Sequence, residues 1–200
     1  MRQRIIFLML IVSVCVNVIL ARRLSNFNRA FNRTSARAVK PGTLVPAFEA
    51  VDPSGQKVQV TYSDDSKPTV LYIFTPPCTW CERNLDSFKK LVDQESGQFR
   101  FIALSLSDQG LAEYIAKNDL KLRVYSDLSS ATKDAYGLGG TPQTIVVSPE
   151  GRVLQNWMGA YVGDQKSQVE AFFHLSLPGL RELPKAESAK EKGQTAPQAN

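Results

Sequence analysis

Two cysteines separated by two residues, Cys78 and Cys81, form the motif of this 200-residue sequence with the clearest potential for chemistry. They follow the near-continuous apolar run Thr69–Phe74, which predicts a strand covered on both faces. They also begin a predicted helix over Cys78–Gln94. Side chains three residues apart on a helix are neighbours, so the two sulfur atoms can form a disulfide bond. The motif therefore points to exchange between a dithiol and a disulfide.

The apolar spacing of the predicted helix assigns each cysteine a role. Cys81, Leu85, Phe88 and Val92 recur at intervals of four, three and four residues, so they share one buried face. Cys78 lies three residues earlier, at the exposed helix start, where free backbone N–H groups and the helix dipole favour a thiolate. We predict that Cys78 is the attacking nucleophile and that Cys81 resolves the mixed disulfide.

Two other uses of a C-x-x-C pair are weaker. A zinc site normally needs two further ligands, and the remaining candidates are Cys15, in an apolar run, and His174, in the apolar stretch 171–175. We interpret His174 as a structural helix residue, so the sequence predicts neither a metal nor a cofactor. A purely structural disulfide over three residues would close a very small loop and stabilise little.

The charge of the chain is unevenly distributed. Residues 1–40 carry eight basic and no acidic residues, so residues 41–200 hold the other 16 of the 24 basic residues against all 19 acidic ones. The formal net charge of +5 therefore hides a net charge of −3 on the part that folds. A nucleic-acid-binding domain carries its basic surface on the fold, so no nucleic-acid partner is predicted. The proportions of 43% hydrophobic and 22% charged residues also exclude collagen, a coiled-coil rod and wholesale disorder.

The amino terminus predicts a membrane segment over residues 1–21. Its apolar run, Ile5–Ala21, is 17 residues long, which as a helix reaches roughly 25 Å, the lower limit for spanning a bilayer. We favour a retained signal anchor over a cleaved signal peptide, because the small-residue cleavage pattern before Arg22 is poor. Lipid attachment at Cys15 is disfavoured because Val14, the residue before it, is bulky.

Two further segments flank the predicted domain, which spans residues 42–180. Residues 22–41 are a basic juxtamembrane linker, and residues 181–200 are a polar tail expected to be disordered. The basic residues after the apolar run outnumber those before it, which by the positive-inside rule alone would leave the domain in the cytoplasm.

The domain alternates strands and helices in an α/β pattern. A hairpin of strands Phe48–Val51 and Lys57–Thr61 is joined by the turn Asp52–Gly55, and a second hairpin joins Gln143–Val147 to Arg152–Met158. Between and after them we predict strands over Phe99–Leu106 and Leu122–Tyr125, and helices over Leu111–Asn118, Ser129–Ala135 and Asp164–Leu177. This order predicts a central sheet covered by helices.

A glycine-rich loop, Gly137–Pro142, precedes the second hairpin. No helix follows it and it lacks the Gly-Lys-Ser/Thr signature, so it is not a phosphate-binding loop. Its useful feature is the Thr141–Pro142 bond, because a proline just before a central strand can be cis in a tight turn.

Together these motifs resemble the thioredoxin fold. More narrowly, a strand, C-x-x-C at a helix start and Gly-Thr-Pro-Gln-Thr before a hairpin resemble the membrane-anchored TlpA-like/ResA-like thiol–disulfide oxidoreductases of bacteria, which are redoxin and AhpC/TSA-like proteins. The resemblance implies that Pro142 is cis and packs against Cys78, and that the Thr141 backbone binds a partner chain as an added strand. It places Pro77 and Trp80 beside the partner-binding surface.

The resemblance also implies partners and a location. The partners would be protein thiols or disulfides and an upstream redox protein. The domain would lie on the extracytoplasmic, periplasmic side of the cytoplasmic membrane, tethered by residues 1–21 as a single-pass anchor.

The chain departs from this family at four positions. Pro77 stands where Trp is usual before the first cysteine, and Trp80 stands where Pro is usual before the second. Asn84 replaces a common acid, and Tyr72 replaces the buried acid of thioredoxins. Glu82 is expected to point to solvent. Two usual proton-handling groups are therefore missing, and the direction of the redox reaction stays open.

Two alternative functions stay open at this stage. Thr75, three residues before Cys78, resembles the thiol peroxidase site, which also needs an arginine over the thiolate, and Arg152 is the candidate. The usual proline of that site is replaced by Leu71. The second alternative is a non-catalytic binding or assembly module that keeps the fold.

Overall fold

A computed structural model describes residue 9 and residues 13–23, 38–64 and 66–182 of the chain. The predicted polar tail lies outside the described residues apart from Arg181 and Glu182, as does most of the predicted linker. The statements below concern the described part.

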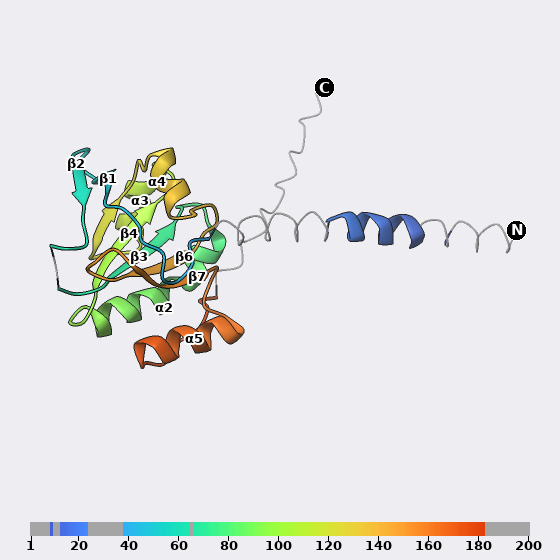
Figure 1. The fold of residues 1–200 in the computed structure, drawn as a ribbon. Helices are drawn as coiled ribbons and strands as arrows, with labels where there is room; N and C mark the ends of the chain where they lie inside the picture. Colours follow the sequence, from blue (N-terminus) through green and yellow to red (C-terminus); the bar gives the residue numbers. More distant parts are fainter. Residues whose placement is uncertain (1–8, 10–12, 24–37, 65, 183–200) are drawn as a thin grey trace, which may run out of the picture.

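A five-stranded mixed sheet forms the centre of the fold (Figure 1). Its order is β5 (Arg123–Tyr125), β4 (Arg100–Ser105), β3 (Thr69–Phe74), β6 (Gln143–Val147) and β7 (Val153–Met158). The first three strands of that order run parallel, whereas β6 and β7 pair antiparallel. The predicted α/β domain with a central mixed sheet is confirmed.

Four helices pack around this sheet, and Figure 1 shows α2 and α5 on one side of it. They are α2 (Thr79–Glu95), α3 (Leu111–Lys117), α4 (Ser130–Ala135) and α5 (Gly163–Phe173). Buried residues of α2, α3 and α5 share one hydrophobic core, so these three helices cover the same face.

Strand β3 divides the interior into two cores. All six of its residues are buried. Val70, Tyr72 and Phe74 face the core under α2, whereas Leu71 and Ile73 face the second core. Alternation with a period of two residues puts neighbouring side chains on opposite faces, so this apolar run fills both cores. The strand thereby holds the segment that follows it, with the cysteines, in a fixed position.

The first predicted hairpin forms a separate two-stranded sheet of β1 (Phe48–Val51) and β2 (Lys57–Val60). Its turn closes as expected, because Oδ1 of Asp52 accepts hydrogen bonds from the backbone N–H groups of Ser54 and Gln56, each at 2.9 Å. The hairpin contributes Phe48 and Val60 to the second core.

The two ends of the domain are attached to different elements, the first to the sheet and the second to α2. The N–H of Gly42 donates to the carbonyl oxygen of Val153 at 2.8 Å, so the incoming chain lies along the edge strand β7. At the other end, the hydroxyl of Ser87 donates to the carbonyl oxygen of Gly179 at 2.9 Å, and Arg181 forms an ion pair with Asp86. Residues near both ends of the predicted domain therefore contact it, and its boundaries stay a prediction.

The last helix is shorter than predicted. Helix α5 ends at Phe173, and His174 is its C-cap in the left-handed conformation, with φ of 54°. His174 lies after the last helical residue, so its interpretation as a residue within the helix was wrong. Its side chain is exposed. A side chain of Glu170 accepts from the N–H of Leu177 at 2.6 Å. This hydrogen bond ties Leu177 back to α5. Residues 174–177, which the sequence predicts as the end of the helix, therefore fold back on it instead of continuing it.

Residues 13–23, which overlap the end of the predicted membrane segment 1–21, are helical. Within the described residues, no helix combines the length and the apolar character needed to cross a membrane. The rest of the segment lies outside the described residues, so the anchor over 1–21 stays a prediction.

Candidate active site

The two cysteines lie at the junction between the end of β3 and the beginning of α2. Cys78 is the N-cap of α2, and its Sγ accepts a hydrogen bond from the N–H of Cys81 at 3.0 Å. The N–H of Cys78 donates to the carbonyl oxygen of Thr75 at 3.1 Å, which closes the turn after the strand. Cys78 and Cys81 are joined by a disulfide bond, with their Cα atoms 5.2 Å apart.

The two sulfur atoms differ in accessibility. Cys81 is 0% exposed and lies in the core under α2, as the helical spacing predicted. Cys78 is only half-buried. A reagent or partner can therefore reach the sulfur of Cys78 first.

The Thr141–Pro142 loop forms the opposite wall of the site. Its peptide bond is cis. Sγ of Cys78 lies 3.5 Å from the carbonyl oxygen of Thr141, and Oγ1 of Thr141 lies 3.4 Å from Oγ1 of Thr75. These contacts bring together residues that are 63 and 66 positions apart in the sequence. The packing of this loop against Cys78, which the family resemblance implied, is present in the structure.

The surface beside Cys78 is partly apolar. Trp80 is 51% exposed, and the guanidinium of Arg83 lies 5.0 Å from the centre of its ring. Pro77 is exposed as well. Aromatic rings that stand in solvent with a polar neighbour are typical of contact surfaces. The structure thus gathers all the predicted site residues at one end of the sheet.

The region behind the disulfide is polar but contains no acid among the described residues that line it. Asn84 is completely buried, and its Oδ1 accepts from the N–H of Tyr161 at 2.8 Å. The hydroxyl of Tyr161 lies 2.6 Å from Oγ1 of Thr144. Burial holds the pKa of Tyr72 well above its ordinary value, so this phenol stays neutral where thioredoxins carry a carboxyl.

Glu82 does not point freely to solvent, contrary to our expectation. Its carboxylate pairs with Nζ of Lys117 on α3 at 2.9 Å, and its side chain is 27% exposed. The pair holds α3 against the first turn of α2. Sequence reasoning missed it, along with the link from Asn84 to Tyr161, because each depends on segments that are distant in the chain.

Thr75 of the alternative peroxidase site lies beside Cys78, but the arginine of that site lies elsewhere. Arg152 precedes β7 at the end of the hairpin where Val147 pairs with Val153, whereas Cys78 follows the opposite end of β3. The prediction that Arg152 could cover the thiolate was therefore wrong. Cys15 is an exposed free cysteine on the helical residues 13–23. Among the described residues, no group of three His, Cys, Asp or Glu side chains could hold a metal.

Comparison with known proteins identifies the family of this chain. The model of the AhpC/TSA family matches residues 41–156, more than half of the chain. The chain belongs to the AhpC/TSA family. This AhpC/TSA protein is 23% identical over 148 residues to the thiol–disulfide oxidoreductase ResA of Bacillus subtilis, covering 71% of this chain and 79% of ResA.

Solved structures show the same fold. A thiol:disulfide interchange protein DsbE from Chlorobium tepidum superposes with a TM-score of 0.56 and 20% identity, covering 68% of this chain and 98% of its own. The thioredoxin domain of a thiol–disulfide oxidoreductase from Bacteroides vulgatus superposes with a TM-score of 0.54 and 19% identity. The match covers 68% of this chain and 99% of that domain. StoA from Bacillus subtilis superposes with a TM-score of 0.51 and 17% identity, and the match covers 62% of this chain and 96% of StoA.

Family and fold together confirm two sequence predictions for this AhpC/TSA protein. The domain has the thioredoxin fold, and the chain is a thiol–disulfide oxidoreductase of that superfamily.

Proposed function

We propose that this protein exchanges disulfides with other proteins through Cys78 as nucleophile and Cys81 as resolving thiol. The observation that carries the proposal is the Cys78–Cys81 disulfide, in which one sulfur is reachable and the other is fully buried. Exchange needs this asymmetry, because the partner must form its mixed disulfide with one defined sulfur.

The reaction balances with these two residues alone. In the reduced protein the Cys78 thiolate attacks one sulfur of a partner disulfide, and the other partner sulfur leaves as a thiolate. The Cys81 thiolate then attacks Sγ of Cys78, which releases the second partner thiol and forms the internal disulfide. Two electrons pass to the partner. The reverse sequence oxidises a partner dithiol, and an upstream redox protein must restore the starting state in either case.

The helix terminus supports Cys78 as the nucleophile. The N–H of Cys81 already donates to Sγ of Cys78 at 3.0 Å, and α2 directs the positive end of its dipole at this atom. Both interactions stabilise a thiolate relative to a thiol. The same sulfur therefore serves as the attacking group in one direction and as the leaving group in the other.

The partner would bind along the Thr141–Pro142 loop. No hydrogen bond to the N–H of Thr141 occurs within the described part of the chain, and its carbonyl oxygen faces Cys78. An extended partner segment could pair with this backbone as an added strand. Exposed Trp80 and Pro77 would supply apolar contacts on the other side of the sulfur.

We further propose that the domain works on the extracytoplasmic side of a bacterial membrane, tethered by residues 1–21. The apolar run Ile5–Ala21 supports a tether, and the family resemblance supports the side of the membrane. A topology reporter fused after Lys40 tests this. Reporter activity on the extracytoplasmic side would support the proposal, and activity in the cytoplasm alone would refute it.

Trapping of the mixed disulfide tests the reaction. Full-length protein carrying Cys15→Ala, which removes the third thiol, is prepared with Cys81→Ser or with Cys78→Ser. Each variant is reduced, freed of reductant and mixed with insulin whose disulfides are intact. We expect a stable mixed disulfide with Cys81→Ser, because the resolving thiol is absent, and none with Cys78→Ser. Equal trapping by both variants, or trapping by neither, would contradict the assigned roles.

The same variants separate the alternatives. A thiol peroxidase would consume hydrogen peroxide rapidly and lose that activity with Thr75→Val, whereas we expect this variant to keep insulin reduction within about twofold. A non-catalytic module would keep its cellular function with Cys78→Ala. Retention of that function would show that exchange is not what the cell needs from this protein.

A further inference from the structure

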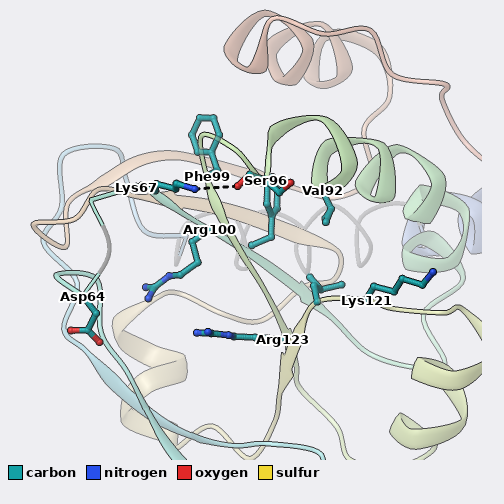
Figure 2. A pocket seen from close by; sticks show the side chains of 10 residues that line it. Asp64, Lys67, Val92, Ser96, Phe99, Arg100, Lys121 and Arg123 are labelled. Carbon is teal, nitrogen blue, oxygen red and sulfur yellow. Dashed lines mark hydrogen bonds between the residues drawn. The ribbon is translucent and has the colours of Figure 1, made fainter.

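A second feature of the molecule lies at the opposite end of the sheet from the cysteines. It is a cavity of about 520 Å³ at the start of β4 and β5, closed on one side by the end of α2. Figure 2 shows its lining, with Arg100 and Arg123 extending to one side and Lys121 extending away from them. We call it the cationic cavity. Its lining residues are Asp64, Lys67, Val92, Ser96, Phe99, Arg100, Phe101, Lys121, Leu122 and Arg123.

Two arginines on neighbouring strands form the centre of its charge. Ile102 pairs with Arg123 in the parallel register of β4 and β5. Arg100 lies two residues before Ile102, so Arg100 and Arg123 are diagonal neighbours on the same face of the sheet. Figure 2 shows both guanidinium groups extending in the same direction from these strands.

Arg100 is held in place rather than free in solvent. It is half-buried, its Nε donates to Oγ1 of Thr69 at 3.0 Å, and its Nη2 donates to the carbonyl oxygen of Thr61. A guanidinium fixed in this way loses little further rotamer freedom when it binds an anion.

The charge of the two arginines is not balanced locally. No carboxylate among the described residues forms an ion pair with Arg100 or Arg123. Asp64, the acidic residue of the lining, accepts from the hydroxyl of Thr61, and Lys121 pairs with Asp119 at 3.1 Å. Two like charges held close together repel each other, and a bound anion would relieve that repulsion.

The other part of the lining is apolar and lies on the side of α2, across the ends of β4 and β5 from the face that carries the two arginines. Val92, Phe99 and Leu122 are partly buried and pack against the core under α2. The cavity volume lies within the range of about 300–1,000 Å³ that is usual for small-molecule sites. A ligand that fits both parts needs an anionic group for the arginines and an apolar or aromatic body for these side chains.

We propose that the cationic cavity binds one small amphiphilic organic anion, meaning a carboxylate, phosphate or sulfonate group on an apolar or aromatic body. The site is separate from the redox site, because β3 runs from the cavity end at Thr69 to the cysteine end at Phe74. The proposal therefore does not depend on the exchange reaction described above.

Titration of the full-length protein with anilinonaphthalene sulfonate, a fluorescent aromatic sulfonate, tests the proposal. We expect saturable binding of one probe molecule, weakened about tenfold or more by Arg123→Glu, since the reversal replaces attraction by repulsion at contact distance. Arg123 is exposed on an edge strand, so the variant should fold, which thermal unfolding checks. Arg123→Gln should weaken binding by a smaller factor.

Lys133→Glu is the matched control, because it reverses the same charge on α4, away from the cavity lining. We expect it to bind the probe like the unaltered protein, and both glutamate variants to keep insulin reduction. The proposal is overturned if Arg123→Glu binds the probe as tightly as Lys133→Glu does, or if no saturable binding is seen. Absence of insulin reduction in the unaltered protein would count against the exchange reaction and leave the probe result standing.

Discussion

Replacement of Asn84 by Asp tests the description of the buried region behind the disulfide. Asn84 is 0% exposed, and its Oδ1 accepts from the N–H of Tyr161 at 2.8 Å. Its Nδ2 has no hydrogen-bond partner among the described residues. Asn84→Asp keeps the acceptor and nearly the same shape, and it adds a carboxyl group that can ionise.

The magnitude follows from burial of the charged form. A fully buried carboxylate with one N–H donor is strongly disfavoured, so the pKa of the introduced carboxyl rises in the folded state. The unfolded chain then loses its proton first, and stability falls as the pH rises from the unfolded pKa through the folded one. An upward shift of the pKa by about 2–3 pH units, at about 1.4 kcal/mol for each unit, predicts a loss of about 3–4 kcal/mol between about pH 4 and pH 7.5.

Urea unfolding of the oxidised protein at several pH values measures this loss. The matched control is Gln94→Glu, the same change from amide to acid at an exposed position of α2. We expect the control to change by less than about 0.5 kcal/mol over the same range. If Asn84→Asp depends on pH no more than Gln94→Glu, the side chain of Asn84 is not buried as described, and the reasoning fails.

Three further outcomes are expected from single substitutions. Tyr161→Phe should destabilise by about 1–2 kcal/mol in urea unfolding, because the buried hydroxyl of Thr144 loses its partner at 2.6 Å. Trp80→Ala should lower kcat/KM for insulin about fivefold or more, since the 51% exposed ring is available to contact the partner. Arg181→Ala should cost about 0.5 kcal/mol at neutral pH. Its ion pair lowers the pKa of Asp86, so this difference should vanish as the pH falls below the ordinary range of a carboxyl.

Most elements of the fold could be predicted because their signals are local. The period of two residues and the continuous apolar character of Thr69–Phe74 mark a buried strand, and the spacing after Cys78 marks a helix with Cys81 inside. Both patterns reflect the geometry of a single element. The prediction failed at His174, where a left-handed C-cap ended the helix before the apolar pattern did.

Contacts between distant segments could not be predicted in the same way. The pairing of Glu82 with Lys117 depends on where α3 packs against α2. The position of Arg152, far from Cys78, depends on the register of β6 with β3. These contacts are set by packing of whole elements, which a single sequence does not specify residue by residue.

The sequence by itself determined the redox pair, its asymmetry, the α/β order and the approach of Thr141–Pro142 to Cys78 through family resemblance. Only the tertiary structure decided what surrounds these residues. It put a neutral Asn84 and Tyr72 behind the disulfide, and it brought Arg100 and Arg123 together at the far end of the sheet. The reason is physical: periodicity acts within one element, whereas charge balance and buried hydrogen bonds depend on which elements become neighbours.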